Sequence, residues 1–153
     1  MASVDDRDRK LLAMLQRDSR TTIPDMADQT GMSTAFVQRR LKALRESGFI
    51  QREVAVLDQQ KLGFGVTAIV SVELERDRLD HIDAFKRKAR LDPQVLNFYC
   101  IAGDADFVMI VVAKDIAGYA AFTHRFFFTD TNVRRFRTSI VVSTEKATLE
   151  LPL

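Results

Sequence analysis

The 153-residue sequence contains one cysteine, no tryptophan, two histidines and no long apolar run. A single cysteine, Cys100, excludes an intrachain disulfide framework and a cysteine-rich zinc site. His81 and His124 lie far apart in the sequence and offer little material for a metal centre or a histidine-based active site. No apolar segment approaches the roughly 18–20 residues needed to cross a bilayer. We therefore expect no cofactor, no metal and no membrane partner.

The N-terminus also lacks the features of a secretory signal. Residues 1–6 end in two aspartates and are followed by a charged segment. A secretory signal instead needs a basic start and an apolar stretch. We therefore expect a cytoplasmic protein. The length fits one ordinary domain or two small ones, and 46% hydrophobic residues is typical of a globular chain.

Positive charge is concentrated in one short stretch of a nearly neutral chain. The chain has 23 basic and 21 acidic side chains, which gives a net charge of +2. Residues 1–31 hold five basic and six acidic side chains, whereas residues 32–52 hold five basic ones and only Glu46 as an acid. Such a block indicates either a focused contact with a polyanion or a solvated helix face, and charge alone does not separate the two.

The first 47 residues are predicted to form three helices. Leucines at three-to-four spacing make residues 1–17 an amphipathic helix. Residues 22–30 and 33–47 each start with a hydroxyl residue that can cap a helix, and Gly31 between them is open to positive φ. Three helices with a short turn between the second and third describe a helix-turn-helix.

Two further segments organise the chain after Gly48. Residues 49–56 alternate enough for a short β-ribbon, or wing, and residues 58–65 are polar and punctuated by glycine, as in a linker. We therefore expect one domain over 1–57, a linker over 58–65 and a second domain over 66–153.

The second half of the chain alternates strand and helix patterns. The expected order is β-α-β-β-α-β, over residues 66–75, 79–91, 95–102, 107–113, 115–130 and 136–143. The short Gly103-Asp104-Ala105-Asp106 connection signals a hairpin. This order is the ferredoxin-like split motif. The predicted fold class is α+β, with an N-terminal winged helix-turn-helix followed by a C-terminal ferredoxin-like βαββαβ domain.

A ferredoxin-like domain of this size leaves one face of its sheet uncovered. We assign to that face the apolar set Phe64, Val66, Ala68, Val70, Val111 and Ala113. An uncovered apolar face predicts a dimer that forms through the two sheets.

The second helix of a helix-turn-helix enters the major groove, and its first residues reach the base edges. Gln38 can pair with adenine, Arg39 with guanine or phosphate, and Arg52 in the ribbon can touch the backbone. Arg40 has two open interpretations, a phosphate contact or an ion pair with an acidic residue of the first helix such as Asp8. The predicted DNA contacts are Ser33, Thr34, Ala35, Gln38, Arg39, Lys42, Arg45 and Arg52.

Segments in both halves resemble the Lrp/AsnC (feast/famine) transcriptional regulators. In the first half these segments are residues 5–12, 15–20, 26–27, 31–33, 40–44 and 48–50. In the second half, residues 99–107 resemble the strand and Gly-Asp hairpin of the family, residues 138–141 its last strand, and residues 151–153 its C-terminus. The resemblance covers nearly all of the chain in order.

The resemblance implies an amino-acid-binding, RAM/ACT-like C-terminal domain and dimers that assemble further, commonly into octameric rings. The implied partners are double-stranded DNA, a small amino-acid-like effector and further copies of the chain. Effectors of the family lie between dimers near the hairpin, and the residues carried over are Tyr99, Ala102, Gly103, Asp104, Asp106, Thr138 and Ser139. Met32 stands where the family usually has Leu, which is a mild apolar change. Thr34 stands where the family frequently has Pro, which leaves the target sequence open.

The hairpin has two interpretations. An amino acid carries an ammonium, which Asp104 or Asp106 can pair with, and a carboxylate, which backbone N–H groups around Gly103 can receive. Alternatively, a tight turn needs glycine and aspartate for its own conformation and hydrogen bonds. The basic run 134–137 likewise indicates either a second nucleic-acid patch or a solvated strand edge.

Three hypotheses of function follow. The first is a sequence-specific DNA-binding regulator controlled by an amino-acid-like molecule. The second is an architectural protein that wraps DNA without an effector. The third is an enzyme similar to the siroheme decarboxylases, which resemble the same family but rely on pocket residues such as histidine. We expect no enzymatic activity.

Overall fold

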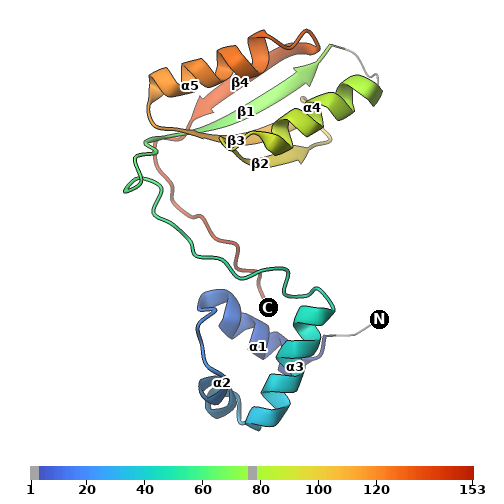
Figure 1. Cartoon of the computed structure of the whole chain (residues 1–153), viewed down its shortest axis with the longest axis vertical. Coiled ribbons are helices and arrows are strands. Elements are labelled where there is room, and N and C mark those ends of the chain that lie inside the picture. Colours follow the sequence, from blue (N-terminus) through green and yellow to red (C-terminus); the bar gives the residue numbers. More distant parts are fainter. Residues whose placement is uncertain (1–3, 76–78) are drawn as a thin grey trace. The chain divides into compact units, whose positions relative to one another are not determined.

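The computed structural model describes residues 4–75 and 79–153 of the chain (Figure 1). The chain divides into two compact units. One consists of Met1–Val56 together with Glu145–Leu153, and the other of Leu57–Thr144.

The first unit contains three helices, α1 (Asp6–Arg17), α2 (Ile23–Thr30) and α3 (Thr34–Glu46). Gly31 ends α2 in the left-handed conformation, with φ of 69°, and turns the chain into α3. The helix-turn-helix expected from the sequence is therefore confirmed. Residues 1–3 of the first predicted helix lie outside the described residues. The apolar faces of the three helices meet in one core, made of Leu11, Leu15, Met26, Ala27, Val37, Leu41 and Leu44.

Each of these helices begins at a side-chain cap. In α1, Asp5 Oδ1 accepts the Asp8 N–H at 2.8 Å and Asp8 Oδ2 accepts the Asp5 N–H at 3.2 Å, which forms a capping box. Thr22 and Ser33 cap α2 and α3, because each hydroxyl oxygen accepts the N–H three residues further on at 3.2 Å. The caps place the start of α3 directly after the turn.

An ion pair between Asp8 and Arg40 joins α1 to α3. Arg40 Nε donates to Asp8 Oδ1 at 2.7 Å, and a terminal guanidinium N–H donates to Oδ2. The Asp8 side chain is fully buried, and 30% of the Arg40 side chain stays exposed. The hydrogen bonds from Arg40 hold the pKa of Asp8 below its ordinary value, so the buried carboxylate stays charged. Of the two interpretations of Arg40, the structure therefore supports the ion pair.

The β-ribbon predicted for residues 49–56 does not form. Residues 51–57 are extended and exposed, and no described residue pairs with them as a strand. The segment is anchored at its start, where the Ile50 N–H donates to the Leu44 carbonyl at 3.2 Å. A ribbon needs a second strand to accept and donate its backbone hydrogen bonds, and the sequence pattern of one strand does not supply it.

The C-terminal segment contacts α1 of the first unit. The Gln16 side chain pairs with the backbone of Leu151, donating to its carbonyl at 2.8 Å and accepting its N–H at 2.9 Å. Arg17 forms an exposed ion pair with Glu150 at 2.9 Å. Residues 145–153 therefore belong with α1 in the first unit.

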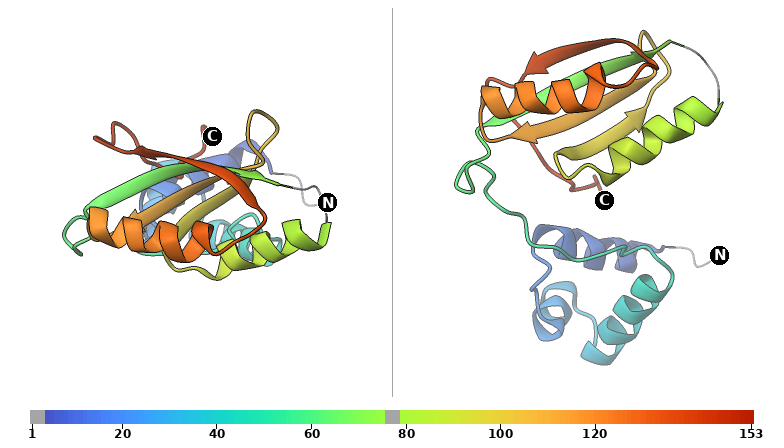
Figure 2. Two further views of the ribbon diagram at one scale, coloured as in Figure 1. Left: turned by 90° about the horizontal axis from the view of Figure 1, so that it is seen from above. Right: turned by 45° about the horizontal axis from the view of Figure 1, so that its top comes forward.

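The second unit is a four-stranded antiparallel sheet in the order β2-β3-β1-β4, with its helices on one face (Figure 2). The expected ferredoxin-like order of elements is confirmed. The last strand begins three residues earlier than expected, and the expected helix 115–130 is split into α5 and a π-helical turn, η1. The elements are β1 (Val66–Leu74), α4 (Leu79–Leu91), β2 (Val95–Cys100), β3 (Phe107–Ala113), α5 (Ile116–Thr123), η1 (His124–Phe128) and β4 (Val133–Ile140).

The residues predicted for the uncovered face of the sheet lie on its helix-covered face, so this prediction is wrong. The five strand residues assigned to it face the helices and are buried, namely Val66, Ala68, Val70, Val111 and Ala113. They pack there among aromatic rings such as Phe85 and Phe122, and Phe64 before the strand is half-buried. One phase of β1 is apolar at every position from Val66 to Leu74, whereas the other holds Ile69 among polar residues, so the more apolar phase packs against the helices.

The other side of the sheet forms an open sheet face. The register places Ile69 opposite Ile110, and 41% of the Ile69 surface is exposed. The cross-strand pairs assign to the open sheet face Ile69, Ser71, Tyr99, Val108, Ile110, Arg137 and Ser139. Among residues 4–75 and 79–153, no helix is long and apolar enough to cross a membrane.

We predict that Asp8→Asn loosens the first unit, because it leaves the Arg40 guanidinium without its charged partner. Breaking a fully buried pair costs about 3–5 kcal/mol, and the partial exposure of Arg40 reduces our expectation to about 2–3 kcal/mol. Native-state hydrogen exchange of the α3 amides measures this loss for the first unit alone. Asp6→Asn is the control, because Asp6 is an exposed aspartate in the same first turn of α1. This change should lower the free energy of unfolding by well under about 1 kcal/mol.

The same pair predicts a pH dependence. Because the folded-state pKa of Asp8 is depressed, its contribution is complete above the ordinary aspartate pKa of about 3.9 and is lost as the pH falls through the folded value. The difference between wild type and Asp8→Asn should therefore shrink below about pH 4. A difference that stays constant down to pH 2 would contradict this assignment.

Candidate nucleic-acid interface and effector site

The predicted DNA contacts in α3 share one exposed side of the helix. The buried side carries Val37, Leu41 and Leu44. The residues outside that stripe are exposed, namely Ser33, Thr34, Ala35, Gln38, Arg39, Lys42 and Arg45. Arg40 is not on this side, because it pairs with Asp8. The other basic side chains of α3 are exposed to solvent.

These basic side chains are not equally available. Arg45 pairs with Glu53 at 2.8 Å, and Lys42 lies 3.7 Å from Glu46, both in exposed ion pairs. Exposed pairs of this kind are weak and exchange readily for other anions. Within the part of the chain that the structure describes, no carboxylate pairs with Arg39 or Arg52. Arg39 is therefore the uncompensated cation of α3.

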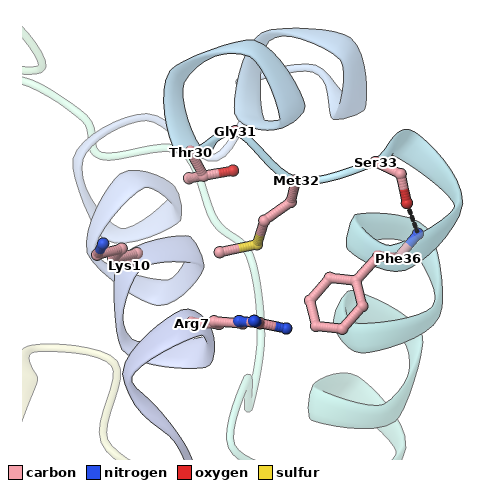
Figure 3. Close-up of a pocket in the computed structure, with 7 residues that line it drawn as sticks. All are labelled: Arg7, Lys10, Thr30, Gly31, Met32, Ser33 and Phe36. Atoms are coloured by element: carbon pink, nitrogen blue, oxygen red, sulfur yellow. Dashed lines mark hydrogen bonds between the residues drawn. The ribbon is translucent and has the colours of Figure 1, made fainter.

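Phe36, in the first turn of α3, borders this surface. The ring is half-buried, with Arg7 Cζ at 5.6 Å and Arg39 Cζ at 5.5 Å from its centroid. It also lines a cavity of about 390 Å³ between α1, the turn and α3 (Figure 3). No sequence signal marks Arg7 as part of this surface, because its contact to Phe36 depends on how α1 packs against α3.

The hairpin residue Asp106 is bound within the chain. Its Oδ2 accepts the Leu74 N–H at 2.8 Å, and its own N–H donates to the Val72 carbonyl at 3.0 Å. Its carbonyl accepts the Ile101 N–H at 3.0 Å, which closes the hairpin. Asp106 therefore joins the hairpin to the end of β1, and this favours the turn interpretation for this residue.

The tip of the hairpin is open. Ala102, Gly103 and Asp104 are exposed, and Tyr99 is 52% exposed at the end of β2. Gly103 does not have a positive φ, and a Cβ added there would meet no described atom within 4 Å. The conformation of this chain therefore does not itself require glycine at the tip.

Thr138 and Ser139 do not share a face of the sheet. Ser139 lies opposite Ile69 on the open sheet face, as does Tyr99 through its pairing with Val108. The Thr138 hydroxyl instead lies 2.6 Å from the Tyr119 hydroxyl of α5, on the helix-covered face. Burial raises the pKa of Tyr119. In this chain the Thr138 side chain therefore lies on the opposite side of β4 from Ser139.

The basic run 134–137 lies on the edge strand β4. Arg135 pairs with Glu73 of β1 at 2.9 Å, and Arg137 lies 3.9 Å from the same carboxylate. The hydrogen bond from Arg135 is the main reason that the pKa of Glu73 is lowered. These contacts favour a solvated strand edge over a second nucleic-acid patch.

Comparison with known proteins assigns a function to each half of the chain. A family model of the winged helix-turn-helix DNA-binding domain matches residues 4–51, and a model of the Lrp/AsnC ligand-binding domain matches residues 67–151. An HTH-type transcriptional regulator of Sinorhizobium fredii is 41% identical over 150 residues, which cover 98% of this chain and 89% of the relative.

Solved structures share the fold over nearly the whole chain. An AsnC family transcriptional regulator from Agrobacterium tumefaciens has a TM-score of 0.92 and 35% identity, covering 97% of this chain and 96% of its own. A transcriptional regulator from Neisseria meningitidis, solved as an L-Met complex, has a TM-score of 0.93 and 25% identity, covering 98% and 97%. The chain, a transcriptional regulator with a DNA-binding helix-turn-helix and a ligand-binding domain, belongs to the Lrp/AsnC family.

Proposed function

We propose that this regulator binds specific duplex DNA through α3 and that a small amino-acid-like effector, bound between dimers, modulates its activity or assembly. The observation that carries the proposal is the exposed side of α3, where Arg39 lies beside Gln38 without a carboxylate partner among the described residues. The buried Asp8–Arg40 pair and the Ser33 cap orient this side outward. A rigid helix with a basic, amide-bearing face suits a major groove.

The contacts have different roles in this proposal. Ser33, Thr34 and Ala35 approach the base edges from the first turn of α3. Gln38 pairs with adenine, and Arg39 pairs with guanine or with a phosphate. The remaining basic residues contact phosphates, with Lys42 and Arg45 exchanging their weak exposed ion pairs for the DNA backbone and Arg52 reaching it from the extended segment.

The effector site is proposed at the exposed hairpin tip. Asp104 would pair with the ammonium of an amino acid, and backbone N–H groups around Gly103 would receive its carboxylate. Support comes from Gly103, whose lack of a side chain serves no contact within the chain and leaves room for something outside it. Tyr99, Ala102 and Ser139 are proposed as further lining residues. The L-Met complex of the Neisseria relative supports an amino acid as the class of effector.

We also propose that two copies associate through the open sheet face and that these dimers assemble further, as an octamer. The exposed Ile69 and the neighbouring Ile110 and Val108 supply the apolar surface for such an interface. A regulator whose partners are DNA and a metabolite would act in the cytoplasm, without enzymatic activity.

The DNA contact of Arg39 is tested by Arg39→Ala. A bidentate base contact contributes about 1–3 kcal/mol of discrimination, so affinity for the preferred duplex should fall by roughly 5- to 150-fold. Fluorescence anisotropy with the duplex upstream of the coding sequence, against a scrambled duplex of equal length, measures the change. Arg20→Ala removes an equal charge from an arginine paired with Asp18 in the same unit and serves as the control.

Light scattering should show that Arg39→Ala keeps the wild-type oligomer. Equal affinity of Arg39→Ala and wild type would remove Arg39 from the interface, and a wild type that binds neither duplex at low salt, where electrostatic attraction is strongest, would refute DNA binding.

The effector contact is tested by Asp104→Ala in a thermal-shift screen of the standard amino acids, starting with L-methionine. A ligand at 100 times its Kd stabilises the folded state by about 2.7 kcal/mol, and Asp104→Ala should lose most of that shift because the ammonium loses its partner. Wild-type DNA affinity without amino acid should be unchanged. No stabilisation of the wild type by any amino acid would favour the architectural alternative.

Asp106→Ala should behave in the opposite way. It leaves the Leu74 N–H without its carboxylate acceptor, so the apo protein should lose about 1–2 kcal/mol of stability and melt at a lower temperature. The variant should still respond to an amino acid that stabilises the wild type. An unchanged melting temperature would show that this hydrogen bond contributes nothing to the fold.

A further inference from the structure

A cavity on the first unit brings α1 next to the start of α3. Arg7 and Lys10 line it from α1, and Ser33 and Phe36 line it from α3 and its cap (Figure 3). The turn residues 30–32 complete the wall, and none of the lining residues is acidic. The volume of about 390 Å³ admits a small anionic group with its water.

The two cations of this cavity are not neutralised by the segments around them. Asp8, which lies between them in the sequence, is buried against Arg40 on another side of α1. Over the described ranges 4–75 and 79–153, no carboxylate lies within ion-pair distance of Arg7 or Lys10. The cavity wall therefore carries two net positive charges.

Phe36 holds two guanidinium groups close to one ring. Figure 3 shows Arg7 pointing toward the ring, and Arg39 lies at a similar distance from its centroid, 5.5 Å against 5.6 Å. The ring attracts each cation, but the cations repel each other, and an anion nearby offsets that repulsion. The arrangement therefore joins the cavity to the proposed base-reading side of α3.

A hydroxyl donor completes the site. Ser33 Oγ accepts the Phe36 N–H, which leaves its own O–H available to donate. The Thr30 hydroxyl is used differently, since it donates to the Met26 carbonyl at 2.6 Å. The cavity thus offers a guanidinium, an ammonium and one hydroxyl, which are suitable donors for a phosphodiester.

We propose that this cavity binds a backbone phosphate of the DNA through Arg7 and Lys10, so that α1 contributes a sequence-independent contact beside α3. The proposal rests on the proposed DNA-binding function and extends it to residues outside the recognition helix. A phosphate contact sets the register of the protein on the duplex without reading its sequence.

Arg7→Gln tests this contact, with Arg9→Gln as the matched control. Both changes remove one charge from an exposed arginine of α1, but Arg9 does not line the cavity. Affinity is measured by fluorescence anisotropy over a series of KCl concentrations, with the upstream duplex and a scrambled duplex. Arg7→Gln should weaken both duplexes by the same factor and make the slope of log K against log salt shallower by about 0.9 for each cavity engaged.

Arg7→Lys distinguishes the contribution of the positive charge from that of the planar guanidinium group. It should restore the salt slope, because the positive charge is kept, but only part of the affinity, because an ammonium does not stack on Phe36 as a guanidinium does. Hydrogen exchange of α3 should be unchanged in all three variants, which excludes unfolding as the cause.

Inorganic phosphate distinguishes DNA from a free anion as the occupant. It should stabilise wild type more than chloride of equal ionic strength does, and Arg7→Gln should lose that difference. If free phosphate binds but Arg7→Gln keeps the wild-type DNA slope, the site takes a free anion and the proposal is overturned. If wild type binds DNA and Arg7→Gln has the same DNA affinity and salt slope as Arg9→Gln, the phosphate site is refuted while the proposed DNA-binding function stands. If wild type binds no DNA at low salt, it fails together with the proposed function.

Discussion

The buried ion pair between Asp8 and Arg40 is the constraint on which the arrangement of the first unit depends. The same carboxylate takes part in the capping box of α1 and accepts two hydrogen bonds from α3. A charge inside a protein is tolerated only with such full pairing, so the pair specifies how α1 crosses α3. The pair is compatible with the rotation of α3 that buries Val37 and Leu41 in the core and leaves Gln38 and Arg39 exposed.

This constraint also sorts the basic side chains of the first unit by role. Arg40 is used inside the fold, whereas Arg39, its neighbour in the sequence, stays on the surface beside Phe36. Because Asp8 pairs with Arg40, it does not pair with Arg7 or Lys10 on either side of it in the sequence. The buried pair thus leaves the exposed cations of both proposed DNA contacts without the Asp8 carboxylate as a partner.

In the second unit, the alternation of β1 has the comparable role. One phase of the strand closes the aromatic core under α4 and α5, and the other forms the open sheet face. The hairpin is held at the end of this strand by Asp106, which accepts the Leu74 N–H. With Asp106 used in this way, Asp104 and Gly103 remain exposed at the tip, where an effector or a second copy has access.

Local patterns in the sequence determined the elements of this protein. Caps at Thr22 and Ser33, the glycine turn at Gly31 and the period of the apolar residues were sufficient for the helix-turn-helix and the order of the βαββαβ domain, because these signals act within a few residues. Tertiary structure decided everything that depends on which side of an element meets its neighbour. The partner of Arg40, the contact of residues 150–151 with α1 and the approach of Arg7 to Phe36 belong to this second group. Each requires contacts between residues far apart in the chain, and periodicity alone does not specify those contacts.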